Sequence, residues 1–114
     1  MIINIASAPA VLGHTGDAPY SIAKAGVIAI AKHIALEYSD RNIGAYTLAL
    51  GNIYTEATFH TETVIERKKV AMESSMKRWS NPSEMVRIAA RIASEEFARA
   101  IGNKTVILGG TVCV

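Results

Sequence analysis

Residues 20–38, YSIAKAGVIAIAKHIALEY, decide how the rest of the chain can be arranged. This stretch contains no proline and a single glycine, Gly26, and its apolar side chains occur on nearly every side of a helical wheel. A helix of this kind needs burial all round. One face can pack on a sheet, but the opposite face stays in water unless another chain covers it. We therefore predict a helix over residues 20–38 and an oligomer formed through it.

Three short apolar segments have the character of β-strands. Residues 2–6 are apolar on both faces, which is typical of a strand buried between two layers. Residues 46–49 follow a polar connector, and residues 105–108 end at the pair Gly109-Gly110. These three segments are the predicted strands.

Polar and glycine-rich segments separate the strands and helices. Residues 13–19 contain two glycines and Pro19, which predict a loop before the long helix. Residues 61–69 and 71–79 have helical composition with a mixed polar face. We expect this region to form a lid. The apolar side chains expected on the underside of this lid are Val64, Ile65, Met72 and Met76.

A capping sequence marks the start of the last helix. Asn81 is a favourable N-cap residue, Pro82 suits the first helical position, and Glu84 follows at the third. Apolar residues recur mostly at helical spacing beyond it, and Gly102 is well placed to end the helix. We predict a helix that begins at Pro82 and ends near Gly102.

The order of these elements predicts the fold class. Strand, helix, strand, helices and strand in succession imply an α/β fold whose strands pair in parallel through right-handed crossovers. A chain of 114 residues has room for one domain with one modest core. A parallel sheet of about three short strands leaves a bare edge, so we expect this sheet to be part of a larger one.

Composition and charge limit the partners. The chain has 12 Lys and Arg against 10 Asp and Glu, a net charge of +2, which is too weak to argue for nucleic acid or an anionic membrane. The single cysteine, Cys113, cannot form an internal disulfide, so we expect the reducing cytoplasm. No segment approaches the ~20 apolar residues of a membrane span. His33 and His60 lack partners at metal-ligand spacing, so no metal site is predicted.

Two basic stretches, residues 67–69 and 77–79, raise the alternative of a nucleic-acid patch. Glu62, Glu66 and Glu73 offset much of this charge. The favoured interpretation is a solvated helix face.

Candidate catalytic side chains converge on one end of the predicted sheet. Tyr20 and Lys24 are four residues apart and share a helix face. Ser7 ends the first strand, and ligands of parallel α/β sheets collect at the carboxyl ends of strands. A tyrosine hydroxyl ionises near pH ~10, and a neighbouring ammonium favours its ionised form. The spacing alone also occurs by chance, with a half-buried tyrosine and a solvated lysine. His14, in the adjacent loop, is either a weak substrate contact or a solvated side chain.

Several motifs together resemble a known family. Ser7 is followed by Tyr20-Ser21-Ile22-Ala23-Lys24, then by Gly51-Asn52-Ile53-Tyr54-Thr55 and finally by Gly109-Gly110. This arrangement resembles the short-chain dehydrogenase/reductase family, and most closely its beta-ketoacyl carrier-protein reductase branch. The similarity covers essentially all 114 residues. It implies that residues 1–114 form a partial Rossmann-like domain, the catalytic and substrate half, without the dinucleotide-binding half.

The resemblance also implies roles. Tyr20 would be the general acid in carbonyl reduction and the base in alcohol oxidation. Lys24 would bind the nicotinamide ribose and assist Tyr20, and Ser7 would hydrogen-bond the substrate oxygen. The cofactor would be NAD or NADP, and the substrate a small carbonyl or alcohol compound. Residues 61–79 would fold over this substrate and determine the specificity. The residues expected to contact the cofactor are Tyr20, Lys24, Gly51, Ile53 and Thr55.

The sequence departs from the family pattern, which leaves two functions open. Leu50-Gly51 stands where relatives have Pro-Gly, Tyr46 replaces the usual Asn, and a glycine-rich turn of the TGxxxGxG kind is missing. The first hypothesis is an oxidoreductase chain or fragment that transfers hydride to or from NAD(P) and is inactive in isolation. The second is a catalytically inactive, truncated module that only oligomerises, through the helix at 20–38 and the strand at 105–114. Cofactor binding distinguishes them.

Overall fold

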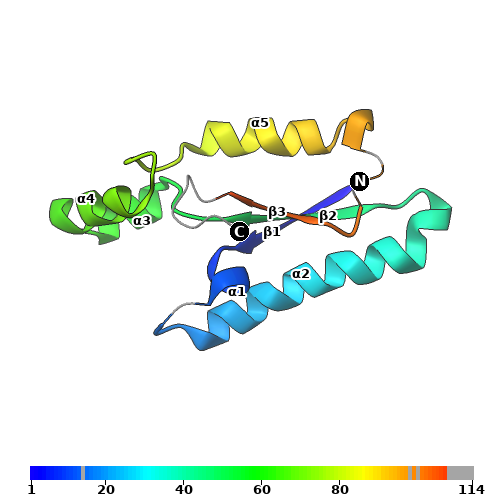
Figure 1. Cartoon of the computed structure of the whole chain (residues 1–114), viewed down its shortest axis with the longest axis horizontal. Helices are drawn as coiled ribbons and strands as arrows, with labels where there is room; N and C mark the ends of the chain where they lie inside the picture. Colours follow the sequence, from blue (N-terminus) through cyan, green and yellow to red (C-terminus); the bar gives the residue numbers. More distant parts are fainter. Residues whose placement is uncertain (14, 98, 100, 108–114) are drawn as a thin grey trace.

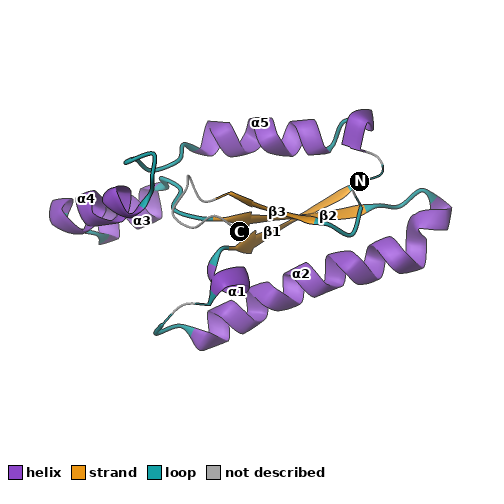
Figure 2. Ribbon diagram, in the orientation of Figure 1, coloured by secondary structure: helices purple, strands orange, loops and turns teal. Residues whose placement is uncertain are grey.

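A computed structural model describes residues 1–13, 15–97, 99 and 101–107. Three parallel strands lie between helices on both faces of one sheet (Figures 1 and 2). The strands are β1 (Ile2–Ser7), β2 (Ala45–Leu50) and β3 (Lys104–Ile107), in the order β1-β2-β3. Ser7 pairs with Leu50, and Leu50 with Ile107, so all three strands end at the same edge. The predicted α/β fold with parallel strands is confirmed.

Helix α2 (Ala18–Tyr38) covers one face of the sheet. Its two buried residues, Ala31 and Ala35, are small, and so are the sheet residues on the same face, such as Ala45 and Ala49. Small side chains on both sides let helix and sheet approach closely. The other side of α2 is exposed in the single chain, as expected: Ile22 is 72% and Leu36 84% exposed.

Helix α5 (Pro82–Ile92) covers the opposite face and builds the core there. Tyr46, Leu48 and Ile92 are its buried centre. The Tyr46 hydroxyl lies 2.5 Å from Oγ1 of Thr105, so this side chain ties β2 to β3 inside the core. The partly buried residues packed against the centre are Ile3, Leu50, Ile88, Ala89, Phe97 and Ile107.

The last helix begins at Pro82 as predicted but ends earlier. It stops at Ile92 and is followed by a 3-10 turn, Glu95–Phe97, so the prediction that it reaches Gly102 is wrong. The Ser94 hydroxyl donates to the Arg91 carbonyl at 2.5 Å, and such side chains compete for the carbonyls that would continue a helix. Gly102 has φ +73 and lies in the turn before β3, where its N–H donates to Ala45.

Two short helices, α3 (Glu56–Thr61) and α4 (Val64–Glu73), lie beyond the carboxyl end of the sheet (Figure 1). They replace the predicted helices at 61–69 and 71–79. Thr55 and Thr63 each form a capping box with the residue three positions later, and these caps fix where the helices begin. The expected lid underside is also wrong: the four apolar side chains assigned to it, Val64, Ile65, Met72 and Met76, are all exposed.

Strand β1 is an edge strand, which corrects its predicted burial between layers. Ile2 and Ile5 are 40% and 46% exposed, and β1 has a neighbouring strand on one side only. The chain after β1 forms a short helix, α1 (Pro9–Leu12), instead of entering the loop directly. The polar connector after α2 is a 3-10 turn, Ser39–Arg41.

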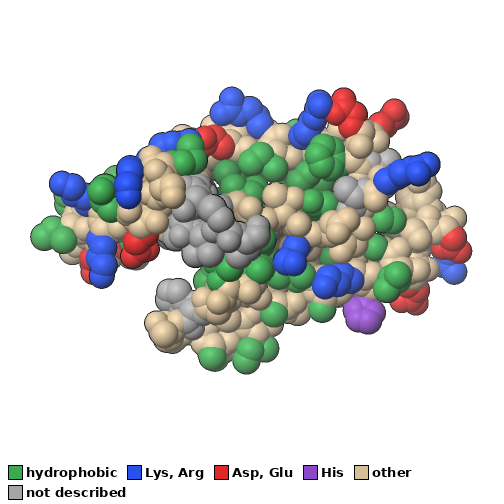
Figure 3. All heavy atoms as spheres, viewed as in Figure 1, with side chains coloured by type: hydrophobic (Ala, Val, Ile, Leu, Met, Phe, Trp, Pro, Cys, Tyr) green, Lys and Arg blue, Asp and Glu red, His purple; other side chains and the backbone are tan. Residues whose placement is uncertain are grey.

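Figure 3 shows how the charged side chains are distributed on one face of the molecule. Lysine and arginine side chains lie among aspartate and glutamate side chains on this face. Among the described residues, no helix is long and apolar enough to cross a membrane, and no group of three potential metal-binding side chains occurs.

Candidate functional site

The first wall of the site is the carboxyl end of β1. Ser7 is the last residue of that strand and pairs with Leu50 of β2. The next N–H, that of Ala8, donates to the Leu50 carbonyl at 2.8 Å, so the chain stays against β2 as it leaves the sheet. Ser7 is therefore held at the edge where all three strands end.

The first turn of α2 supplies the second wall. Asp17 caps the helix by accepting from the N–H of Tyr20 at 3.2 Å, and Pro19 occupies the first turn. This cap places Tyr20 in the first turn and Lys24 one turn later on the same face. The Lys24 ammonium lies 5.8 Å from the centre of the Tyr20 ring and donates to the carbonyl of Ile5 at 3.1 Å.

The third wall is the segment that follows β2. The N–H of Gly51 donates to Ile107 at 2.8 Å, and Ile53 then forms a parallel bridge with Ser80. Ser80 accepts from Tyr54 at 2.9 Å and donates to Asn52 at 3.0 Å. In a parallel bridge the N–H and C=O of the central residue point to the other side. Neither group of Ile53 has a hydrogen-bond partner among the described residues.

These walls enclose an open cavity of about 290 Å³. It brings together the six residues singled out for catalysis or cofactor contact: Ser7, Tyr20, Lys24, Gly51, Ile53 and Thr55. Tyr20 is 44% exposed, so its hydroxyl can be reached from solvent. His14 and the pair Gly109-Gly110 lie outside the described residues. The volume is at the low end for a small-molecule site, so the cavity suits only part of a dinucleotide complex.

Three further residues line this cavity from the α3–α4 side: Thr58, Glu62 and Trp79. Thr58 lies there because its hydroxyl, 2.8 Å from that of Thr55, belongs to the cap of α3. Trp79 is held by its indole N–H, which donates to the Arg67 carbonyl at 3.0 Å. Sequence reasoning assigned substrate specificity to residues 61–79 without naming a residue, and it missed Thr58. The Thr55-x-x-Thr58 capping pattern is the signal that could have found it.

An ion pair connects the residue before Trp79 to the first turn of α5. Arg78 binds both carboxylate oxygens of Glu84, at 2.6 and 2.9 Å. Hydrogen bonding from Arg78 and from the N–H of Asn81 lowers the pKa of Glu84 from 4.5 to about 2, and the same pair raises the pKa of Arg78. Arg78 is exposed and Glu84 is half-exposed, so this pair orients the backbone more than it stabilises the fold.

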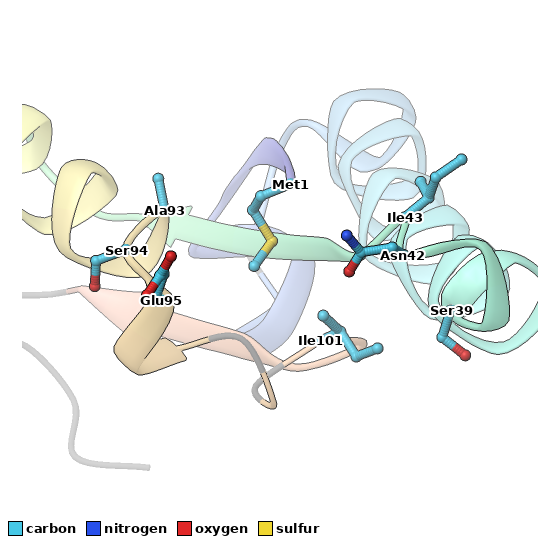
Figure 4. A pocket seen from close by; sticks show the side chains of 9 residues that line it. Met1, Ser39, Asn42, Ile43, Ala93, Ser94, Glu95 and Ile101 are labelled. Carbon is cyan, nitrogen blue, oxygen red and sulfur yellow. The ribbon is translucent and has the colours of Figure 1, made fainter.

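A second cavity, of about 320 Å³, lies at the opposite end of the sheet (Figure 4). Met1, Ile43 and Ile101 give it apolar walls, and Asn42 and Glu95 stand at its margin. It is slightly larger than the first, but none of the six predicted site residues lines it. The residues that could carry chemistry together are those at the carboxyl edge of the sheet.

Comparison with known proteins agrees with this arrangement. The model of the family described as "Enoyl-(Acyl carrier protein) reductase" matches residues 1–111. A 3-oxoacyl-(acyl-carrier-protein) reductase of Vibrio cholerae is 32% identical over 111 residues, which are 96% of this chain and 44% of that protein. This chain belongs to the short-chain dehydrogenase/reductase family.

Other family members are similarly related. Glucose 1-dehydrogenase 2 of Bacillus subtilis is 29% identical over 109 residues, 96% of this chain and 42% of that protein. The solved structure titled "4-hydroxyisoleucine dehydrogenase complexed with NADH" superposes with a TM-score of 0.86 at 25% identity, covering 97% of this chain and 46% of that one. The predicted Rossmann-like fold is thereby confirmed. The chain spans less than half the length of the relatives it matches.

Proposed function

We propose that this chain is the catalytic and substrate-binding half of an NAD(P)-dependent oxidoreductase acting on a carbonyl or alcohol compound. The observation that carries the proposal is the convergence of Ser7, Tyr20 and Lys24 with Ile53 around one cavity. The family is one of NAD(P)-dependent oxidoreductases, and a structural neighbour is described as complexed with NADH. We place the protein in the cytoplasm.

Three residues at the cavity have different roles in carbonyl reduction. The exposed Tyr20 hydroxyl donates its proton to the substrate oxygen and takes it back in alcohol oxidation. Ser7 donates a hydrogen bond to the same oxygen and orients it. Lys24 places a positive charge 5.8 Å from the centre of the Tyr20 ring. An ammonium has three N–H donors, and Ile5 uses one, so others can hold the nicotinamide ribose.

The segment after β2 fits the nicotinamide carboxamide. A carboxamide offers an N–H donor and a C=O acceptor. The N–H and C=O of Ile53, which have no partner among the described residues, complement both. Gly51 and Thr55 flank Ile53 at the same cavity. When bound, the nicotinamide supplies or accepts the hydride. Either NAD or NADP meets these requirements.

We propose that the 114-residue chain is inactive alone and that a dinucleotide-binding half completes the sheet. In β1 the N–H of Ile2 donates to Gly44 of the loop before β2 and that of Ala8 to Leu50, so even-numbered residues face β2. The backbone groups of Ile3, Ile5 and Ser7 therefore face the open edge. A further parallel strand pairing there would bring its own ligand-binding loops to the edge that carries Ser7.

Hydride transfer in a chimeric enzyme tests this proposal. Residues 1–114 would replace the matching segment of the Vibrio cholerae reductase, and NADH or NADPH oxidation would be followed with a panel of ketones. Cofactor-dependent reduction of a ketone is the expected result. A folded chimera that binds the cofactor but reduces none of the ketones would contradict it.

The second candidate function is an inactive module that only oligomerises, and the exposed side of α2 favours it. One exposed stripe of that helix contains Ile22, Gly26, Ala29, His33 and Leu36, with large apolar residues at its two ends. Such a stripe suits close packing against a second copy. Under this alternative the chain sediments as an oligomer that Leu36→Glu dissociates, and it shows no affinity for NADH or NADPH. Oligomer formation together with cofactor binding supports the oxidoreductase, in which α2 forms the homo-oligomer contact.

A further inference from the structure

One carboxylate in the cavity has no role in the chemistry described above. Glu62 follows α3 in an extended conformation, with φ −103 and ψ 143, and directly precedes Thr63, the N-cap residue of α4. It lines the same cavity as Ser7 and Tyr20. Glu62 is therefore placed to touch a molecule that Tyr20 acts on.

The described cations near this part of the chain are engaged elsewhere. Arg67 stacks on Phe59, Arg78 is paired with Glu84, and Lys24 donates to Ile5. No hydroxyl or amide group compensates either: Oε2 of Glu62 is buried and has no hydrogen-bond partner among the described residues. Buried polar atoms are nearly always paired in folded proteins. Because Glu62 also lines the cavity, a rotation of its carboxylate would bring this unpaired oxygen to a donor on a bound ligand.

We propose that Glu62 is a specificity-determining residue that accepts a hydrogen bond from a hydroxyl or ammonium group of the substrate. This inference rests on the proposed function and names the substrate class: a ketone, or the corresponding alcohol, with a second donor group near the reacting carbon. An ionised carboxylate only accepts hydrogen bonds. Substrates that carry an anionic group at that position are therefore rejected by charge repulsion.

Four small ketones test the inference on the chain itself. Hydroxyacetone, aminoacetone, butanone and pyruvate share a methyl ketone and differ in the neighbouring group, which is a hydroxyl, an ammonium, a methyl or a carboxylate. Their dissociation constants would be measured from amide shifts of Ser7, Gly51 and Thr55 in the ¹⁵N-labelled chain. We expect hydroxyacetone or aminoacetone to bind about tenfold more tightly than butanone, and pyruvate more weakly than butanone.

Two substitutions of Glu62 distinguish recognition of a hydroxyl group from recognition of an ammonium group. Glu62→Ala removes the preference for the donor-bearing ketone. Glu62→Gln keeps an acceptor without the charge, so it retains a preference for hydroxyacetone but loses one for aminoacetone. Glu66→Gln is the matched control, because that carboxylate lies on α4, bonds to Thr63 and can be replaced by glutamine in the capping box. Circular dichroism verifies that each variant is folded.

The inference is overturned if the four ketones bind equally, if no cavity amide shifts with any of them, or if Glu62→Ala keeps the preference. These results differ from a failure of the proposed function. A chimera that reduces butanone as well as hydroxyacetone leaves the oxidoreductase intact and removes the role of Glu62.

Discussion

Replacing Arg67 by alanine should loosen the α3–α4 region without weakening the rest of the fold. The Arg67 guanidinium lies 3.8 Å from the centre of the Phe59 ring and donates to the Phe59 carbonyl at 3.2 Å. Phe59 in turn packs edge-on against Tyr54, with ring centres 4.4 Å apart. Arg67 therefore joins α4 to α3 and to the segment that leaves β2.

The size of the effect follows from the two contacts that Arg67→Ala removes. A partly buried cation–π contact is worth about 1 kcal/mol, and a hydrogen bond from a charged donor adds about 1 kcal/mol in this half-exposed setting. A loss of about 2 kcal/mol raises local opening about 30-fold. Arg67→Lys retains the stacked charge without the guanidinium geometry, so about half of the loss is expected.

Amide hydrogen exchange measures this opening directly. Protection of the α3 and α4 amides should fall about 30-fold in Arg67→Ala, because such regions open as local units. Amides of β2 and α5 should keep their protection, since α3 and α4 contribute no residue to the core around Leu48. Lys68→Ala, at the neighbouring exposed position of α4, is the control.

The reasoning is refuted if α3 and α4 exchange as slowly in Arg67→Ala as in the parent chain. It is also refuted if β2 and α5 lose protection by the same factor, because α3 and α4 would then unfold together with the core.

Three further predictions concern stability. Gly44→Ala should lower the free energy of unfolding by about 1–3 kcal/mol in urea titrations, because its Cβ would lie 2.4 Å from Cγ2 of Ile101. Gly26→Ala should raise the free energy of unfolding by about 0.5–1 kcal/mol at a concentration where the chain is monomeric, since an added Cβ in α2 meets no described atom within 4 Å. A change in the same direction in both variants would contradict this. The pKa of Glu84 is lowered on folding from 4.5 to about 2, so its contribution is present above pH 4.5 and is lost as the pH falls toward 2. In Glu84→Gln the urea midpoint should therefore change less with pH between pH 5 and about 2 than in the parent chain. The same pH dependence in both proteins would argue against the Arg78–Glu84 pair.

The location of the candidate site could be predicted from the sequence because it depends on local spacing and on topology. Tyr20 and Lys24 share a helix face by their four-residue spacing alone. Ser7 joins them because parallel strands end at one edge, and this order was readable from the succession of strands and helices. The start of α5 at Pro82 was equally local, since Asn81 and Glu84 form its cap.

The α3–α4 region was harder to predict because tertiary contacts decide it. The capping box of Thr63 and Glu66 was present in the sequence and would have corrected the helix boundaries. The outward orientation of Val64 and Ile65 was not readable, because α4 turns Arg67 toward Phe59 instead. Glu62 was seen only as an offset to positive charge, since its place in the cavity depends on how α3 and α4 sit against Trp79. The exposure of Ile5 likewise reflects the edge position of β1 and not its composition.

The most direct test of the account is the turnover number of Tyr20→Phe in the chimeric enzyme. The variant loses only a hydroxyl, so cofactor affinity and folding should be unchanged. Without the proton donor, we expect turnover to fall about 100-fold or more. Tyr38→Phe, which removes a hydroxyl at the far end of the same helix, should turn over like the parent chimera. Normal turnover by Tyr20→Phe, or an equal loss in Tyr38→Phe, would contradict the assignment of Tyr20 as the group that carries the proton.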